Sequence, residues 1–390
     1  MHRKTWMLLV GSITIVSLLA LGWRLIGARL TTPAAAQADW AVARAVNGPA
    51  LGNFKRVTEV RPLVFPNDHG PHREYQTEWW YYTGNLQGAS GERWGYQLTF
   101  FRSGLTPDTP QRESQWATSE VYLAHFAVTD AAGRRFAADA QLARGGSIDL
   151  AGAQARPYRV FVKNWSAEGS GDTARLRAAT EQVSIDLNLR SLKPATLQGN
   201  QGLSQKSAEV GNASYYYSLT RMQTTGTIAF GGKTASVEGL SWMDHEWGTS
   251  ALGADQVGWD WLGMQVSDGS DLMWGQLRRT DGTAESIDGS LTDADSTVTP
   301  LQQGDVRWTP LATWRSPHTG VEYPARWRLQ IPKVGLDAEV TPLIPDQELR
   351  VGLTYWEGAV RVQGTRGGQP IDGYGYVELT GYGAGAQQTR

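Results

Sequence analysis

Apolar and polar residues alternate in short runs along most of the chain, the pattern of strands that bury one face and expose the other. In residues 183–189 every second residue is apolar, and residues 326–331 and 259–262 repeat the pattern. Residues 258–266 and 271–278 flank an Asp-Gly turn, which predicts a hairpin. Beyond residue 50 no segment has a convincing helical period. Further strands are predicted at residues 78–86, 96–102, 121–129, 159–165, 215–223, 354–363 and 374–380.

Many short strands at hairpin spacing predict an all-β sandwich or barrel. The roughly 340 residues of such sequence exceed the 200–250 that one all-β domain usually holds. We therefore expect two β domains, residues 60–250 and residues 251–390. The boundary is placed near residues 249–256, because the small-residue run from Gly248 to Ala254 has little to pack against a core.

The N-terminal segment has a different pattern. Arg3 and Lys4 precede an apolar run at residues 6–23, and Ala34-Ala35-Ala36 resembles a signal cleavage site. The run is also just long enough to cross a bilayer. We expect residues 1–36 to be a signal peptide or membrane anchor and residues 37–59 a linker. The rest is then periplasmic or secreted, and it is held at the inner membrane by residues 6–23 if the segment is not cleaved. A buried helix of the folded domain is the alternative.

Composition and charge exclude several classes of function and of binding site. The chain has 390 residues with 36 Lys+Arg against 38 Asp+Glu, a balance that argues against a nucleic-acid partner. It has no Cys, which excludes disulfides, thiolate metal sites and a cysteine nucleophile. Neither a phosphate-binding loop nor a G-x-S-x-G nucleophile elbow occurs on a strand-to-helix turn, so nucleotide hydrolysis and α/β-hydrolase chemistry lack their usual motifs.

Two segments place ionisable groups among large aromatic side chains. Residues 68–86 run from a polar loop into a strand of consecutive aromatics. Residues 239–248 contain Trp-Met-Asp-His-Glu-Trp, and Gly-Trp-Asp-Trp follows at residues 258–261. Such surroundings desolvate a carboxyl group and raise its pKa, the usual way to keep an acid protonated near neutral pH.

These segments resemble the signatures of a known family. EWWYYTGNL at residues 78–86 and WMDHEWG at residues 242–248, with HFAVTD at residues 125–130, are similar to motifs of the AttH-like family. That family includes the carotenoid 1,2-hydratases, also called hydroxyneurosporene synthases, and proteins labelled predicted secreted hydrolases. The resemblance extends from about Val60 to the C-terminus. It implies two lipocalin-like antiparallel β-barrel domains and a pocket for an apolar ligand.

The resemblance also implies a catalytic site. Carried over by motif, the hydratase site falls on His245, Trp247 and Asp260, with Asp244 adjoining. We assign proton donation to the two aspartates, water activation to His245 and cation stabilisation to Trp247. One departure is Gly258, which stands near where we expect the hydratases to carry an aromatic residue. The candidate ligand-binding residues are Glu78, Trp79, Trp80, Tyr82, His125, Trp242, Trp259 and Trp261.

Structural interpretations compete with these assignments. The tryptophans also suit core packing, His125 shares its strand face with apolar residues, and Glu78 suits a buried partner of Arg73 or of an indole N–H. A metal on His69 and His72 requires a third ligand such as Glu74 or Glu78, and a hydrogen-bonded loop is favoured instead. We predict no metal and no other cofactor.

Two classes of function remain open. The first is an enzyme that protonates and hydrates an isoprenoid or lipid-like alkene, a hydro-lyase related to carotenoid 1,2-hydratase, or a hydrolase as relatives are labelled. The second is a non-catalytic periplasmic carrier of a lipid or siderophore-like ligand. In both, the partner is an apolar small molecule in an aromatic-lined pocket.

Overall fold

The computed structural model describes residues 53–107, 117–146, 149–249, 252–253 and 255–383. The chain divides into two compact units, Met1–Arg44 and Ala45–Arg390, and the following account concerns the second. The predicted signal or anchor segment lies outside the described residues. Within them, no helix has the length and apolarity needed to cross a membrane.

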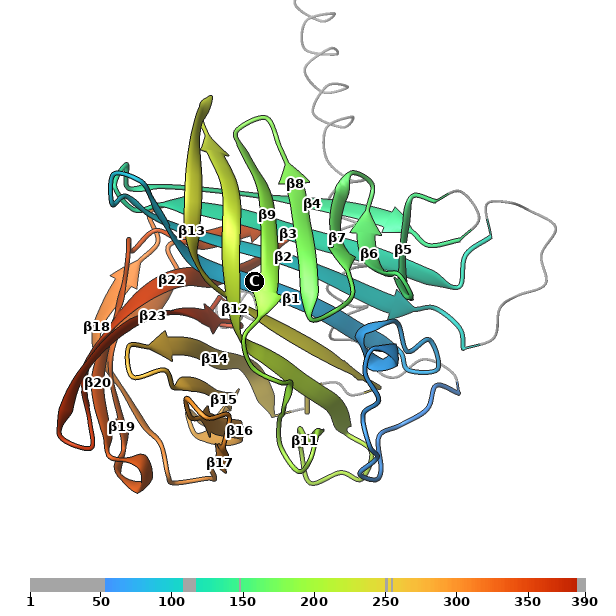
Figure 1. Ribbon diagram of the computed structural model, residues 1–390. Coiled ribbons are helices and arrows are strands. Elements are labelled where there is room, and N and C mark those ends of the chain that lie inside the picture. The colour runs from blue at the N-terminus through green and yellow to red at the C-terminus, as the bar shows by residue number, and fades with distance from the viewer. Residues whose placement is uncertain (1–52, 108–116, 147–148, 250–251, 254, 384–390) are drawn as a thin grey trace, which may run out of the picture. The chain divides into compact units, whose positions relative to one another are not determined.

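The second unit is built from antiparallel strands, which confirms the all-β prediction. The described residues form two barrel-like sheets, shown in Figure 1, and two short 3₁₀ helices, η1 (Asn67–His69) and η2 (Pro332–Val334). One sheet uses strands between residues 77 and 248 and the other uses strands between residues 256 and 379. Placing a domain boundary near residue 250 stays a prediction, and residues 250, 251 and 254 lie outside the described part.

The first sheet has thirteen strands among the described residues, in the order β4-β3-β2-β1-β13-β12-β9-β8-β7-β6-β5, with β10 and β11 paired to β12. The strands are β1 (Thr77–Gly88), β2 (Arg93–Gly104), β3 (Glu120–Asp130), β4 (Arg135–Arg144), β5 (Ala151–Ala155), β6 (Tyr158–Val162), β7 (Trp165–Gly169), β8 (Thr173–Ala179), β9 (Val183–Ser191), β10 (Thr196–Leu197), β11 (Leu203–Gln205), β12 (Ala213–Phe230) and β13 (Lys233–Gly248). The sheet curls, so that β5 and β6 come back into contact with β3.

The second sheet has ten strands in the described part of the chain, in the order β17-β16-β15-β14-β23-β22-β20-β19-β18, with β21 on β22. The strands are β14 (Gln256–Val266), β15 (Asp271–Arg279), β16 (Ala284–Thr292), β17 (Val298–Pro300), β18 (Arg307–Arg315), β19 (Glu322–Ile331), β20 (Leu336–Pro342), β21 (Glu348–Val351), β22 (Leu353–Arg366) and β23 (Gln369–Leu379). The predicted hairpin is the β14–β15 pair.

Burial along the strands explains where the aromatic residues gather. β8 and β9 alternate between buried and exposed side chains, because one face meets the core and the other meets water. β1 and the second half of β13, residues 241–248, are buried on both faces, since one face lines the interior of the first sheet and the other contacts the second sheet. In the sequence, the strands that are covered on both faces are therefore the ones with consecutive aromatic and apolar residues.

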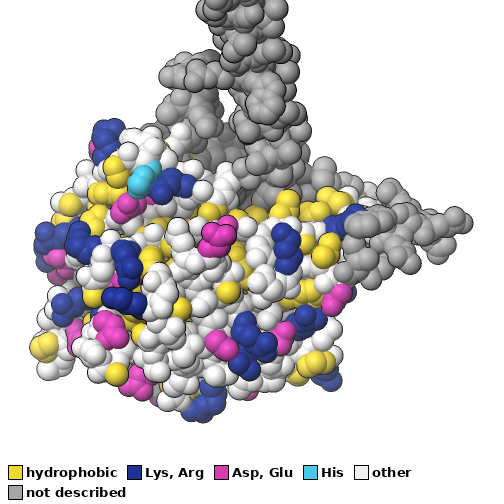
Figure 2. Space-filling view, turned by 90° about the horizontal axis from the view of Figure 1, so that it is seen from above, with side chains coloured by type: hydrophobic (Ala, Val, Ile, Leu, Met, Phe, Trp, Pro, Cys, Tyr) yellow, Lys and Arg dark blue, Asp and Glu magenta, His cyan; other side chains and the backbone are white. Residues whose placement is uncertain are grey.

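The molecular surface carries both charges. On the face shown in Figure 2, Lys and Arg side chains lie among Asp and Glu side chains. This agrees with the near-neutral composition of the chain.

Candidate functional site

The strand period divides the Trp-Met-Asp-His-Glu-Trp motif of β13 between the two faces of the sheet. Asp244 and Glu246 line a cavity between the two sheets. His245 and Trp247 belong to the other face, where they contact side chains inside the first sheet. Neighbouring residues of this motif therefore lie alternately in the cavity between the sheets and in the interior of the first sheet.

The cavity between the sheets has a volume of about 160 Å³. Its walls include aromatic side chains from both sheets, among them Trp79 and Phe101 on the first and Trp259 and Trp261 on the second. Carboxyl groups interrupt these walls. They are Asp244, Glu246, Asp260, Asp288, Glu357 and Glu378.

Asp244 is a buried carboxyl surrounded by hydrogen-bond donors. The Tyr216 hydroxyl donates to its Oδ2 at 2.7 Å, the Trp242 indole N–H donates to its Oδ1 at 2.7 Å, and Ser218 also donates to Oδ1. Burial raises the pKa of Asp244 to about 7, although these three donors oppose the shift. The carboxyl is therefore poised to hold or release a proton near neutral pH.

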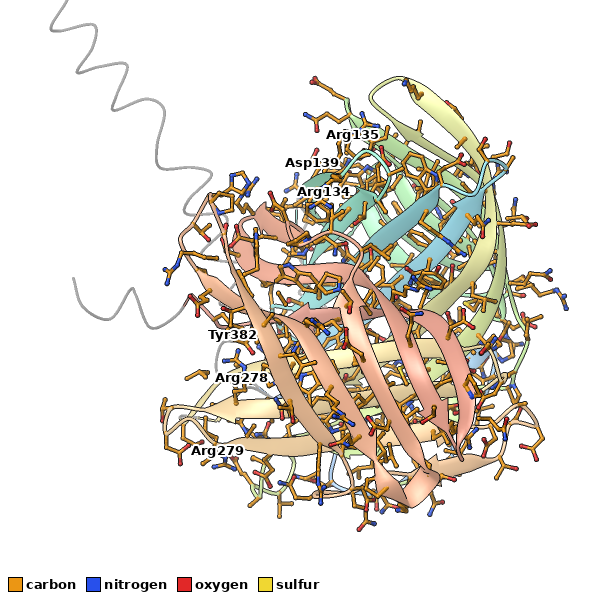
Figure 3. All side chains as sticks on the ribbon, turned by 90° about the vertical axis from the view of Figure 1, so that its left-hand side faces the viewer. Arg134, Arg135, Asp139, Arg278, Arg279 and Tyr382 are labelled. Atoms are coloured by element: carbon orange, nitrogen blue, oxygen red, sulfur yellow. The ribbon has the colours of Figure 1, made fainter. Side chains whose placement is uncertain are left out.

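Asp260 has a different environment. Its carboxylate accepts hydrogen bonds from Gln276 at 2.7 Å, from Arg278 at 3.0 Å and from Tyr382 at 3.1 Å. Figure 3 labels Arg278 and Tyr382 next to one another, and the guanidinium lies 3.7 Å from the centre of the tyrosine ring. Burial raises the pKa of Asp260, but the Arg278 charge opposes it. Asp260 is among the residues that line the cavity, although the strand period directs its side chain to the opposite face of β14 from Trp259 and Trp261.

Gly258 fits the local geometry for a steric reason. A Cβ atom on this residue would lie 2.3 Å from the carbonyl oxygen of Thr380. The close approach of these two backbone segments excludes the aromatic residue that the resemblance led us to expect near this position.

The remaining carboxyls include two that sequence reasoning missed. Glu357 on β22 and Glu378 on β23 are opposite one another in the antiparallel register, and both line the cavity. Burial, followed by the charge of Glu378, raises the pKa of Glu357 well above its ordinary value. In the sequence, each of these two apolar strands shows a single carboxyl residue at this point. Only the pairing of β22 with β23 shows that the two carboxyl groups lie side by side.

The predicted ligand-binding residues also separate by face. Trp79, Trp259 and Trp261 line the cavity. Trp242 packs against Trp261 with ring centroids 6.1 Å apart and belongs to the apolar cluster between the sheets. His125 lies behind the cavity wall, because its Nδ1 is 2.8 Å from the hydroxyl of the lining residue Tyr355.

The other three predicted residues, Glu78, Trp80 and Tyr82, point into the first sheet. Glu78 lies at the centre of a buried ionic network there. Its carboxylate is 2.8 Å from Arg102 Nε, 2.8 Å from His72 Nδ1 and 3.0 Å from His245 Nε2. The Arg102 charge and the two histidines hold the pKa of Glu78 well below its ordinary value in spite of its burial.

Three groups of this network have the composition of a metal site. His72, Glu78 and His245 bring one ligand atom each to within 4.8 Å of the others. However, the Glu78 carboxylate already pairs with the buried Arg102, and His72 Nε2 pairs with Asp68 at 2.8 Å. His69 contacts Tyr217 instead. The polar groups thus satisfy one another as a hydrogen-bonded network.

Comparisons with known proteins agree with this architecture. A sequence profile described as AttH-like matches residues 56–382. The crystal structure of an AttH-type protein from Nitrosomonas europaea is 35% identical, with a TM-score of 0.75 over 84% of this chain and 100% of that chain.

Two further comparisons involve a fungal hydratase. The curated kievitone hydratase of Fusarium solani subsp. phaseoli is 26% identical over 218 residues, which are 53% of this chain, and this chain spans 59% of that relative's length. The crystal structure of kievitone hydratase from Nectria haematococca is 17% identical, with a TM-score of 0.64 over 85% of this chain and 97% of that chain. The second match shows that the two proteins share a fold.

Proposed function

The chain belongs to the AttH-like family, and we propose that it adds water to a carbon–carbon double bond of an apolar small molecule held between its two sheets. The observation that carries the proposal is Asp244, a buried carboxyl with a pKa raised to about 7 that lines a cavity with indole walls. The sequence similarity to a kievitone hydratase supports the same class of reaction.

The cavity suits acid-catalysed hydration. A protonated Asp244 can donate to one alkene carbon in a site whose walls are largely aromatic. The cation that develops on the second carbon would lie near the faces of Trp79, Trp259 and Trp261, which stabilise positive charge. Water then forms the new carbon–oxygen bond. Asp260 is the weaker candidate for the acid, because its carboxylate pairs with Arg278.

The cavity volume limits what enters it. About 160 Å³ is close to the roughly 150 Å³ of an apolar cavity that accepts benzene. A whole carotenoid or lipid is far larger, so we propose that the cavity receives the unsaturated end group of the ligand.

Hydration can be tested directly with a defined panel. We expect the full chain to add water to at least one member of a set containing kievitone, isoprenoid alkenes and unsaturated fatty acids. Mass spectrometry after incubation in heavy-oxygen water should show one labelled oxygen in the product. Recovery of only unaltered compounds, together with saturable binding of one of them, would decide for the carrier.

We propose further that the folded unit lies outside the cytoplasm. Arg3 and Lys4 ahead of the apolar run favour retention of the N-terminus on the cytoplasmic side. A reporter that is active only in the cytoplasm, fused after Trp40, should therefore be silent, and a reporter active only in the periplasm should give a signal at the same position. Cytoplasmic activity would contradict export.

A further inference from the structure

A cluster of polar atoms between the sheets lacks partners within the protein. Among the described residues, both carboxylate oxygens of Glu357 and the hydroxyls of Tyr81 and Tyr376 have no hydrogen-bond partner. The Tyr81 and Tyr355 hydroxyls are near enough to Glu357 to lower its pKa, but neither meets hydrogen-bond geometry with its carboxylate. Buried polar atoms are nearly always paired, so this cluster is suited to a polar group from outside the chain.

The two glutamates of the cavity are placed as a pair. Glu357 lies opposite Glu378 in the register of β22 and β23, so their side chains share one face of the sheet. Glu357 is 1% exposed. Glu378 also lies deep in the protein and keeps accessible surface because it lines the cavity.

Three other buried carboxylates of this protein have cationic partners. Glu78 pairs with Arg102, Asp260 pairs with Arg278, and Asp271 pairs with Lys193 and Arg221. In the part of the chain that the structure describes, neither Glu357 nor Glu378 forms a salt bridge. Because Glu357 and Glu378 are directly opposite one another on neighbouring strands, the negative charge of one strongly disfavours ionisation of the other in this buried site.

We propose that Glu357 and Glu378 share one proton and bind the attacking water of the hydration reaction, an inference that rests on the proposed function. One carboxyl of the pair stays protonated while the other is a carboxylate, which gives the cavity a base opposite the acid Asp244. The orphaned Tyr81 hydroxyl, which belongs to a lining residue of the cavity, supplies a further hydrogen bond to the bound water.

The reaction balances with this assignment. The π electrons of the alkene take the proton of Asp244 to form a C–H bond, and the water oxygen forms a C–O bond to the resulting cation. The O–H bond of that water breaks, and its proton passes to the Glu378 carboxylate. Exchange with solvent then returns a proton to Asp244 and removes one from Glu378, so the net change is the addition of one water.

The electrostatic surroundings agree with this division of roles. Burial raises the pKa of Glu378 to about 7, and the charges of Asp244 and Glu246 on β13 contribute while the Trp259 indole opposes. Around Glu357 the titratable groups are Tyr81 on β1, Tyr355 on β22 and the paired Glu378. Tyr376 on β23 also interacts with Glu357.

A titration that needs no substrate tests the shared proton. Between about pH 4.5 and about pH 7 the folded state should hold a proton on Glu378 that the unfolded state has released, so stability falls as pH rises through this window. In the wild type, the folding equilibrium constant should fall as pH rises, by up to about tenfold per pH unit for each proton that only the folded state holds. In full-length Glu357→Gln and Glu378→Gln this fall with pH should be less steep than in the wild type. Urea unfolding across this window measures the difference. The infrared band of protonated carboxyls near neutral pH should weaken in Glu357→Gln.

The matched control is Glu348→Gln on β21, beside β22. Glu348 is also buried, but Ser316, Thr319 and Tyr323 donate hydrogen bonds to it. This variant should keep the wild-type carboxyl band and lose stability at neutral pH, because an amide offers one acceptor oxygen to three donors. Unchanged bands and unchanged pH slopes in both cavity variants would overturn the shared proton.

The hydration assay tests the role in binding water. With the panel compound that the wild type hydrates, Glu378→Gln should bind the compound but lose about 10²-fold or more in turnover, and the acidic limb of its pH profile should disappear. Wild-type turnover in both cavity variants, alongside loss in Asp244→Asn, overturns this inference and leaves the proposed function intact. A wild type that hydrates no compound of the panel overturns the proposed function, and the role in binding water with it.

Discussion

Asp244→Asn should lower the rate of hydration by about 10²–10⁴-fold, the usual contribution of a general acid. The amide has no proton acidic enough to transfer to an alkene carbon. Its size and shape match the carboxyl, so the Tyr216, Ser218 and Trp242 donors around it should keep at least one acceptor. Turnover of the hydrated panel compound and its dissociation constant, measured on the same preparation, separate loss of chemistry from loss of binding.

The pH profile supplies a second readout of the same role. Because the pKa of Asp244 is raised to about 7, the protonated form declines above neutral pH. Wild-type kcat/KM should therefore fall about tenfold per pH unit on the alkaline side. In Asp244→Asn the residual rate should lack this alkaline limb.

Asp260→Asn is the matched comparison. Both aspartates are 3% exposed, but Asp260 directs its carboxylate at Arg278, Gln276 and Tyr382. We expect this change to reduce stability more than turnover, because it leaves the guanidinium of Arg278 without its partner. Near-normal turnover in Asp244→Asn combined with loss in Asp260→Asn would transfer the acid role to Asp260.

Residue order and period predicted much of the fold. Alternation along residues 183–189 gives β9, and the Asp-Gly turn gives the β14–β15 hairpin, because each depends on contacts that are local in the sequence. The two aromatic motifs become β1 and β13, which pair directly, so that Tyr81 lies opposite Asp244 and Trp80 lies opposite His245.

The composition of the site depended on long-range pairing. Asp244 and His245 are adjacent in sequence, and a family motif treats them as one unit, but the strand period sends them to opposite faces of the sheet. Glu357 and Glu378 meet only because β22 pairs with β23 in one particular register. A shift of one residue would turn either side chain away from the cavity, and no local signal in these strands fixes that choice.

On the face of β1 and β13 that turns away from the cavity, the ionic network around Glu78 should stabilise the fold. Glu78→Ala should lower the free energy of unfolding by about 3–5 kcal/mol. The change removes the nearest carboxylate of Arg102, which is 1% exposed, and among the described residues leaves it only the longer ion pair with Glu120 at 3.8 Å. His72 loses one of its two carboxylates and keeps Asp68. Urea denaturation of the purified chain at neutral pH measures the loss.

Two comparisons show whether the ionic network causes that loss. Glu74→Ala removes an exposed carboxylate from the same loop, so its effect should stay within about 0.5 kcal/mol. Arg102→Met added to Glu78→Ala removes the buried charge that has lost its nearest partner and should recover part of the stability, giving a coupling energy in a double-mutant cycle. A loss of less than about 1 kcal/mol in Glu78→Ala would mean that the network does not hold the sheet together.

The pH dependence of this network should be opposite in sign to that of the cavity glutamates. Because the folded-state pKa of Glu78 lies well below its ordinary value, its contribution is complete above about pH 4.5 and is lost as pH falls through the folded pKa. Glu378 instead makes the protein more stable as pH falls from about 7. If folded Glu78→Ala retains turnover per molecule, the motif residues on this face act by supporting the strands that carry Asp244. If turnover disappears while the fold persists, the predicted catalytic role of His245, which contacts Glu78, regains support.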